Sequence, residues 1–327
     1  MNIRHIKRRL KGYRRDMRVL VTGGAGFIGS HLVVKLLARG DEVVVCDDLS
    51  VGSIGRIESY LSYPRFQFIK GDLQDSRTLK AVGAYDMVFH MASNADISKS
   101  MIQTDLDLRL GVMTLYNVLE SMRLGGCRKI FFPSGSGVYG DVGRTLTAEN
   151  FTPMHPISMY GASKLACEAM ISAFCHMFDM QAWIGRLANI VGSRQTHGVI
   201  LDFVKKLRAD PTRLGILGDG GQSKPYLHVS DCVDAILTII DRSHERLNVF
   251  NIAPDDAIDV LRIAQIVAEE MGATDVRLEL AGGDRGWKGD VPMVRLDVTR
   301  LRKIGWQNKL SSEQAVRMAA RELAGKL

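Results

Sequence analysis

The chain has 327 residues, of which 46% are hydrophobic and 24% are charged. These are ordinary values for one large or two moderate globular domains. No apolar run is long enough to span a bilayer, and the N-terminus lacks the apolar stretch of a signal peptide. We therefore expect a soluble protein that has no membrane partner.

The net charge of +7 is concentrated in one short segment. Residues 1–16 contain seven cations and one acidic residue, which leaves only +1 for the rest of the chain. This distribution argues against nucleic acid as a partner of the folded body. A membrane-surface helix is conceivable here, because Ile3, Ile6, Leu10 and Tyr13 fall at helical spacing. The composition is more typical of a disordered basic extension.

The cysteines indicate a reducing compartment. They are odd in number, scattered, mostly within apolar runs, and without metal-ligand spacing: Cys46, Cys127, Cys167, Cys175 and Cys232. This pattern favours buried reduced thiols over disulfides or a zinc site. We expect a cytoplasmic protein that has no metal site.

From Met17 onward, short β-branched runs alternate with longer helical stretches. Strands are predicted over 17–24, 42–48, 66–72, 86–92 and 129–135, and helices over 27–40, 76–82, 104–123 and 157–179. Apolar runs that are buried on both faces and joined by helices are typical of a parallel, doubly wound α/β sheet.

After about residue 186 this alternation loosens. Glycine-rich turns occupy 217–224 and 280–290, and helices are predicted over 198–209, 258–271 and 311–325. We expect a smaller C-terminal substrate-binding lobe. The predicted ranges are 1–16 for the basic extension, 17–185 for a dinucleotide-binding domain that is rejoined by about 226–253, and 186–327 for the lobe.

The stretch VTGGAGFIGSHL places three glycines between a strand and a helix. Gly23, Gly26 and Gly29 permit a tight turn, close approach of a pyrophosphate to the backbone, and close packing of helix on strand. The helix N-terminus, with Phe27 and Ile28, would supply backbone donors to the phosphates. In this context the pattern predicts a dinucleotide site.

Carboxylates follow the next two strands. Asp47 stands 18 residues after Gly29, where it can accept from both ribose hydroxyls, and no arginine follows immediately to hold a 2′-phosphate. NAD is therefore favoured over NADP, although Asp47 could also be a simple turn residue. Asp72 could accept from the adenine amino group or cap the following helix. The predicted cofactor contacts also include Asp48, Leu73 and Ala92.

The segment YGASK places Tyr160 and Lys164 one helical turn apart, so that a helix beginning near 160 carries both on one face. A phenol is a weak base at neutral pH, but a nearby ammonium and an oxidised nicotinamide favour its ionised form. Such a tyrosine can take a hydroxyl proton while hydride leaves the same carbon. The alternative is an ordinary surface pair of Tyr and Lys.

Several motifs together resemble a known family. TGGAGFIGSHL, VFHMAS, VYGD, YGASK and KPYLHVSDCVDA occur in the order and spacing of extended short-chain dehydrogenases/reductases. Over about 17–325 the chain resembles the NAD-dependent nucleotide-sugar epimerases and dehydratases, in particular the UDP-glucose 4-epimerase-like branch. The resemblance implies a homodimer that inverts C4 of a nucleotide sugar, with a UDP-sugar favoured.

The resemblance also implies residue roles. Tyr160 and Lys164 would act as the proton-transfer pair, with Lys164 also on the nicotinamide ribose. The implied substrate contacts are Asn94, Asn189, Lys224, and either Arg285 or Lys288 facing the diphosphate. Many relatives have Arg-x-Gly-Asp where this chain has Trp-Lys-Gly-Asp, so the phosphate cation is displaced by one or two residues.

Gly135 departs from the family pattern. Relatives carry Ser or Thr four residues before the Tyr of VYG, where the hydroxyl bonds the sugar O4. Either Ser136 or, as the second choice, Ser134 substitutes, or Tyr160 acts with water, or the chemistry differs. A 4,6-dehydratase or decarboxylase is a second possible function, although dehydratases place Asp-Glu where Ser136 and Gly137 stand. A non-catalytic NAD-binding scaffold is a third.

Overall fold

A computed structural model of the chain describes residues 16–94 and 97–325, so all of the predicted basic extension except Asp16 lies outside the described part. The structure divides into two compact units. One contains the described residues up to Pro133 together with Ser163–Ile184 and Ser243–Asn248, and the other contains Ser134–Ala162, Gly185–Arg242 and the described residues from Val249 onward. The assignment of residue ranges to cofactor and substrate domains stays a prediction.

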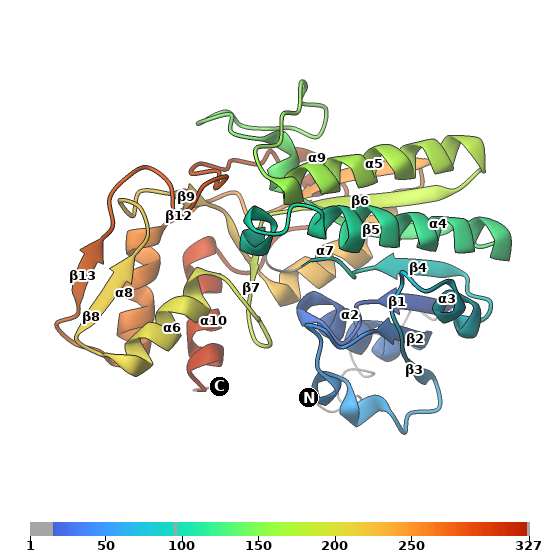
Figure 1. The fold of residues 1–327 in the computed structure, drawn as a ribbon, viewed down its shortest axis with the longest axis horizontal. Coiled ribbons are helices and arrows are strands. Elements are labelled where there is room, and N and C mark those ends of the chain that lie inside the picture. Colours follow the sequence, from blue (N-terminus) through green and yellow to red (C-terminus); the bar gives the residue numbers. More distant parts are fainter. Residues whose placement is uncertain (1–15, 95–96, 326–327) are drawn as a thin grey trace. The chain divides into compact units, whose positions relative to one another are not determined.

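A seven-stranded sheet with the order β11-β6-β5-β4-β1-β2-β3 forms the centre of the fold (Figure 1). Its strands are β1 (Arg18–Thr22), β2 (Glu42–Asp47), β3 (Phe66–Lys70), β4 (Met87–His90), β5 (Lys129–Gly135), β6 (Gln181–Leu187) and β11 (Leu247–Ile252). From β3 to β5 each neighbouring pair is parallel. The predicted doubly wound α/β sheet is confirmed. Its strand order reverses between β1 and β4, and ligands bind at the carboxyl ends of strands at such a point.

The predicted helices of this part form with small differences in their ends. The first, α2 (Phe27–Arg39), buries Leu32, Val33, Leu36 and Leu37 and ends at Gly40, whose left-handed conformation lets its N–H reach the last carbonyls. The helices predicted over 76–82, 104–123 and 157–179 correspond to α3 (Ser76–Val82), α4 (Thr114–Gly125) and α5 (Met159–Met177). The helix α7 (Val229–Arg242) is present in addition and is not predicted from the sequence. Before α4, where the sequence predicts a regular helix, a π-helical turn η4 (Leu108–Met113) is present instead.

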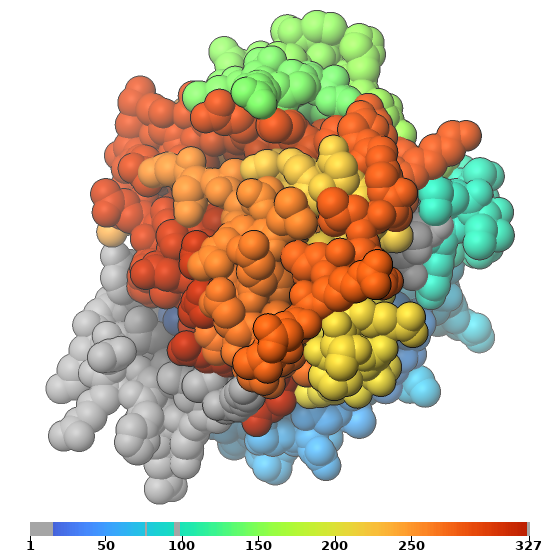
Figure 2. Space-filling model, turned by 90° about the vertical axis from the view of Figure 1, so that its left-hand side faces the viewer, coloured from blue at the N-terminus to red at the C-terminus, as the bar shows by residue number. Residues whose placement is uncertain are grey.

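The C-terminal part contains α6 (Val199–Ala209), α8 (Val260–Met271), α9 (Thr299–Lys303) and α10 (Ser312–Ala324). Three of these confirm the helices predicted over 198–209, 258–271 and 311–325. Short strand pairs complete this region: β7 (Asn189–Val191) with β10 (Tyr226–His228), β8 (Arg213–Ile216) with β13 (Arg277–Leu280), and β9 (Ser223–Lys224) with β12 (Ile258–Asp259). Figure 2 shows this region, from yellow to red, from the side.

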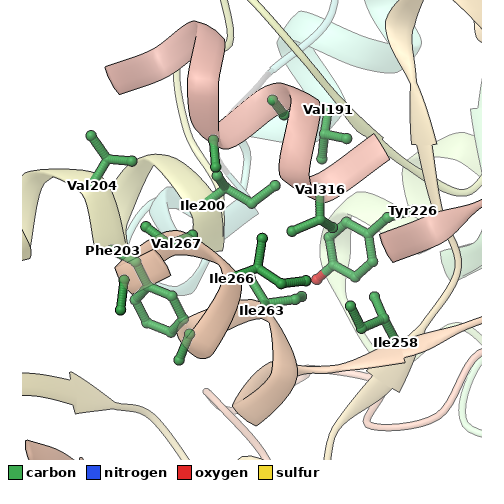
Figure 3. Packing of buried hydrophobic residues seen from close by; sticks show 14 of the residues in the cluster. Val191, Ile200, Phe203, Val204, Tyr226, Ile258, Ile263, Ile266, Val267 and Val316 are labelled. Atoms are coloured by element: carbon green, nitrogen blue, oxygen red, sulfur yellow. The ribbon is translucent and has the colours of Figure 1, made fainter. Parts of the chain in front are cut away.

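A buried apolar cluster holds α6, α8 and α10 together (Figure 3). Its labelled members are Val191, Ile200, Phe203, Val204, Tyr226, Ile258, Ile263, Ile266, Val267 and Val316. Apolar residues recur at helical spacing along α8 and α10, so each helix presents one apolar stripe to the others. Ion pairs from Arg317 on α10 to Glu269 and Glu270 on α8 close the exposed edge of the same contact.

We expect Ile266→Ala to destabilise the protein strongly. Ile266 is fully buried in this cluster, and truncation of a buried isoleucine to alanine removes about 2–5 kcal/mol from the free energy of unfolding. Ile266→Val, which deletes one methylene, should remove about 0.5–1.5 kcal/mol. Urea denaturation of the full-length variants measures both values. Equal stability of Ile266→Ala and the wild type would contradict this account of the core.

Candidate active site

The glycine loop lies between β1 and α2 and is tightly packed. Gly23 has φ +65°, and a Cβ there would lie 2.7 Å from the backbone nitrogen of Ala92; a Cβ on Gly29 would lie 2.3 Å from the carbonyl oxygen of Gly23. Helix α2 begins after Gly26 without a side-chain cap and without an acidic residue in its first turn. Its first N–H groups, next to half-buried Phe27 and Ile28, therefore suit an anion such as a pyrophosphate.

Asp47 lies at the carboxyl end of β2 and is held by two backbone groups. Its Oδ2 accepts from the N–H of Ala25 at 2.9 Å and its Oδ1 accepts from the N–H of Leu49 at 2.9 Å. Burial raises the pKa of this carboxyl group, while these two N–H groups lower it. Asp48 is exposed and accepts from Ser50. Asp47 is thus fixed beside the glycine loop, where a ribose would lie.

The turn after β3 shows whether Asp72 caps the helix that follows it. Asp72 is exposed and accepts from the N–H of Gln74 at 2.8 Å. The cap of α3 is Asp75, which accepts from the N–H of Arg77 at 2.9 Å. Asp72 therefore does not cap this helix and keeps its predicted role as a cofactor contact. The neighbouring Leu73 is buried.

A buried histidine at the end of β4 was missed in the sequence. The Nδ1 of His90 lies 2.9 Å from the hydroxyl of Thr22, and the N–H of Ala92 donates to the same hydroxyl at 3.4 Å. The pKa of His90 falls to about 3, mainly through burial and secondarily through the charge of Lys164. His90 is therefore neutral near pH 7. The only signal in the sequence is a polar residue within the apolar run DMVFHMA.

Helix α5 carries the predicted proton-transfer pair. Lys164 is 5% exposed, and its Nζ donates to the carbonyl oxygen of Pro133 at 2.8 Å and lies 4.7 Å from the centre of the Phe132 ring. Both partners belong to β5. Tyr160, one turn earlier in α5, is half-buried. The ammonium is thus fixed at the carboxyl end of a central strand.

The side chain of Tyr160 faces the end of β5 at Gly135. A Cβ on Gly135 would lie 4.0 Å from Cε1 of Tyr160 and 4.0 Å from the carbonyl oxygen of Leu187, so a Cβ fits there without a clash. Ser134 is 2% exposed, and its buried hydroxyl has no hydrogen-bond partner among the described residues. Ser136 is half-buried and begins the 3₁₀ turn η5 (Ser136–Tyr139). The chain therefore bends away from the sheet at Ser136.

Asn94, a predicted substrate contact, is part of a buried polar cluster. Its Nδ2 donates to the carboxylate of Asp107 at 2.9 Å, and the hydroxyl of Ser100 donates to the same carboxylate at 2.5 Å. Asp107 is 1% exposed and immediately precedes η4. Asp107 therefore fixes the orientation of the Asn94 amide, a role that no local pattern predicts.

The predicted substrate cations of the second unit are paired with carboxylates. Lys224 Nζ lies 2.5 Å from Asp290 Oδ1, and Arg285 donates to Asp141 Oδ2 at 2.6 Å and to the Asp290 carbonyl at 2.7 Å. Lys288 is exposed. Of the two diphosphate candidates, Arg285 is therefore the one with hydrogen bonds to Asp141 and Asp290 within the described residues.

Asn189, the remaining predicted substrate contact, begins β7. It pairs with Tyr226 of β10. Burial raises the pKa of the Tyr226 phenol, and a hydrogen bond with the Asn189 side chain lowers it by a smaller amount.

The cysteine thiols are free, and burial raises the pKa of each of them. Within 16–94 and 97–325, no group of His, Cys, Asp and Glu could hold a metal ion, and no helix is long and apolar enough to cross a membrane.

Known proteins share both sequence and fold with this chain. Residues 19–253 match the family model described as the NAD dependent epimerase/dehydratase family. UDP-glucose 4-epimerase of Mycolicibacterium smegmatis is 32% identical over 92% of this chain and 96% of its own length. A crystal structure of a UDP-galactose 4-epimerase superposes with a TM-score of 0.85 at 39% identity, covering 95% of this chain and 100% of that one.

A third comparison includes a bound dinucleotide. The structure of UDP-glucose 4-epimerase from Thermus thermophilus in complex with NAD has a TM-score of 0.83 at 30% identity, and it covers 95% of this chain and 100% of that one. The similarity extends over nearly the full length of each protein. Both units of the present fold therefore have counterparts in these enzymes.

The packing around Gly135 predicts that a hydroxyl side chain fits there. Gly135→Ser should leave the unfolding temperature nearly unchanged, because the nearest atoms are 4.0 Å from the added Cβ. Gly161→Ala should lower it by several degrees, because its Cβ would lie 2.6 Å from the carbonyl oxygen of Gly137. Thermal unfolding measured by circular dichroism compares the two. A larger loss of unfolding temperature in Gly135→Ser than in Gly161→Ala would contradict the conclusion that Gly135 is less tightly packed than Gly161.

Proposed function

Because the chain belongs to the NAD-dependent epimerase/dehydratase family, we propose that it is a nucleotide-sugar 4-epimerase that inverts C4 of a UDP-sugar through a transient 4-keto intermediate. The observation that carries this proposal is the position of Tyr160, which lies beside Gly135 at the end of β5, on the same helix as the anchored Lys164. The relatives reported above are named as epimerases of UDP-glucose and UDP-galactose, and these names support the choice of a UDP-sugar as the substrate.

NAD is the cofactor of this family, and the residues present fit it. The uncapped N-terminus of α2 suits the pyrophosphate, and Asp47 at the end of β2 suits the adenosine ribose. When bound at these residues, NAD would supply a reversible hydride acceptor for the sugar carbon. Gly23 and Gly29 keep side chains out of the space between loop and helix.

Tyr160 would take the proton from the sugar O4 as the hydride leaves C4, and give it back after the keto sugar has turned over. Lys164 lies one helical turn away on the same helix, so the two side chains would act as a pair. Since burial keeps His90 neutral, that histidine adds no second charge beside Lys164. Lys164 would also bind the nicotinamide ribose.

The hydroxyl that helps Tyr160 would come from Ser136. Strand β5 ends at Gly135, and η5 begins at Ser136, so the alternation of side chains along the strand no longer controls where Ser136 points. Ser134 lies within the strand and is almost fully buried. We therefore keep Ser134 as the second choice.

The proposed substrate contacts are Asn94 in one unit and Asn189, Lys224 and Arg285 in the other. Lys224 and Arg285 already face Asp290 and Asp141. A diphosphate therefore competes with these carboxylates for the cations, and its binding includes the exchange of one anion for another. Lys288, which is exposed, is the alternative diphosphate contact.

We also propose that the protein is a cytoplasmic homodimer. Arg123 of α4 lies 5.3 Å from the ring centre of Phe178, which follows α5, so these two helices run side by side (Figure 1). Large apolar side chains are exposed on α4, on α5 and on the turn η4 that precedes α4: Leu108, Met113, Tyr116, Leu124 and Met177. Such a surface suits a second copy of the chain. The buried free thiols agree with a reducing compartment.

The proposed reaction is tested with a panel of UDP-, GDP-, CDP- and dTDP-sugars, in which nuclear magnetic resonance reports the configuration at C4. We expect inversion of a UDP-sugar. Positioned proton-transfer groups contribute about 10²–10⁴-fold, so Tyr160→Phe should lose kcat on this scale and Ser136→Ala somewhat less. Loss of water or CO₂ from the sugar would favour a dehydratase or decarboxylase. Full activity of Tyr160→Phe would remove the mechanism and favour a scaffold.

The two cations of the 280–290 loop make a second test. Arg285→Met should raise KM for the UDP-sugar about tenfold or more, because a charge-assisted hydrogen bond to the diphosphate is lost. Lys288→Met removes the same charge from an exposed position and should change KM by no more than about threefold. Steady-state kinetics compare the variants. A larger effect at Lys288 would transfer the diphosphate contact to that residue.

A further inference from the structure

In the structure, an arginine lies near Asp47, the predicted ribose contact. The sequence alone does not predict this neighbour. Arg56 lies in the short 3₁₀ turn η1 (Ile54–Arg56), beyond the residues that immediately follow Asp47. Its Nη1 donates to the carbonyl oxygen of Ala25 at 3.1 Å, and the N–H of Ala25 donates to Asp47 Oδ2 at 2.9 Å. Arg56 and Asp47 are therefore joined through opposite sides of one residue of the glycine loop.

The segment between them folds back over the carboxylate. A Cβ on Gly52 would lie 2.7 Å from Asp47 Oδ1, and the N–H of Ser53 donates to the carbonyl oxygen of Ala25 at 3.0 Å. These contacts fix the start of η1 against the glycine loop. Arg56 is half-buried, so its position is set by the fold while part of it is open to solvent.

We propose that Arg56 is a second determinant of cofactor choice, which lets the adenosine site accept the 2′-phosphate of NADP as a minor cofactor beside NAD. A 2′-phosphate next to Asp47 and Asp48 is repelled by two carboxylates. A guanidinium beside Asp47 offsets this repulsion and can donate two hydrogen bonds to one phosphate. The site then prefers NAD, through Asp47, without excluding NADP.

A contact with the pyrophosphate, which both cofactors share, is the competing role for Arg56. The geometry favours the ribose end, because Arg56 and Asp47 bind the carbonyl and the N–H of the same residue, Ala25. Burial raises the pKa of Asp47, and the charge of Arg56 acts in the opposite direction as the smallest of the contributions. The pyrophosphate also has the uncapped N-terminus of α2 as its site. The proposal uses the cofactor of the proposed function but not its sugar substrate, so binding tests it without turnover.

The test is an exchange experiment on the purified full-length protein. Wild type and variants are incubated with equimolar NAD and NADP, free dinucleotide is removed by gel filtration, and the bound dinucleotides are released and quantified by chromatography. The variants are Arg56→Met, Arg56→Lys, and Arg77→Met. Arg77 is a matched control because its side chain is 87% exposed and pairs only locally with Asp75. Circular dichroism verifies that each variant is folded.

We expect wild type to bind NADP as the minor species. Arg56→Met should lower the bound NADP-to-NAD ratio about tenfold or more, while total NAD stays near the wild-type value. Arg56→Lys should keep most of the ratio, and Arg77→Met all of it. The proposal is overturned if wild type binds no NADP, if the ratio is the same in Arg56→Met, or if both dinucleotides are lost together. Should Arg56→Met not fold, an unchanged ratio in Arg56→Gln would overturn it equally. Failure of the sugar panel leaves these results unaffected.

Discussion

The hydrogen bond from the Lys164 ammonium to the carbonyl of Pro133 controls the geometry of the reacting end. An ammonium that is almost fully buried is costly unless it is paired, and here the carbonyl at 2.8 Å and the face of Phe132 provide that pairing. The bond fixes how α5 is rotated against the end of β5. Tyr160, one turn earlier, therefore faces Gly135 rather than solvent alone. Proline at 133 suits this role because only its carbonyl is available for bonding.

The substrate side follows a different electrostatic principle. Lys224 and Arg285 are paired with Asp290 and Asp141, so each cation is compensated within its own unit. Such pairs place cations precisely but weaken their attraction for another anion, because the carboxylates must be displaced or shared. A diphosphate carries two phosphates and can engage both cations together. Under the proposed function, displacing two such pairs would favour a ligand with this charge and length over a single anion.

Local features of the sequence predict most of the fold. Short apolar runs that alternate with helical stretches predict the positions of β1 to β5. Gly40 marks the end of α2, because a left-handed cap favours glycine. The strand β6 was missed, because QAWIGRL follows a long helix with little punctuation. The π-helical turn η4 was also missed, since its sequence LRLGVM differs little from that of an ordinary helix. Such features depend on packing rather than on local preference.

Some residues of the candidate site are predictable from local sequence, and others are not. Asp47 is predictable because a strand and a glycine loop precede it at a fixed spacing. Asp107, Asp290 and Arg56 are not, because each meets its partner across a long stretch of sequence. The same limit applies to Asp72, whose two predicted roles could be separated only when the structure showed Asp75 as the cap of α3.

The backbone conformation at Gly135 affects which serine hydroxyl could lie near Tyr160. Within a strand, side chains alternate, so a hydroxyl at 134 or 136 would point away from the face that 135 presents to Tyr160. This alternation holds for Ser134, which is buried within β5. It does not hold for Ser136, because the strand ends at Gly135 and a 3₁₀ turn begins. At Gly135 only a Cβ is missing beside the phenol, since that atom would lie 4.0 Å from Tyr160 Cε1. The direction of the Ser136 side chain is set by the turn and not by the pleat of the strand, which is why Ser136 rather than Ser134 is the proposed source of the hydroxyl.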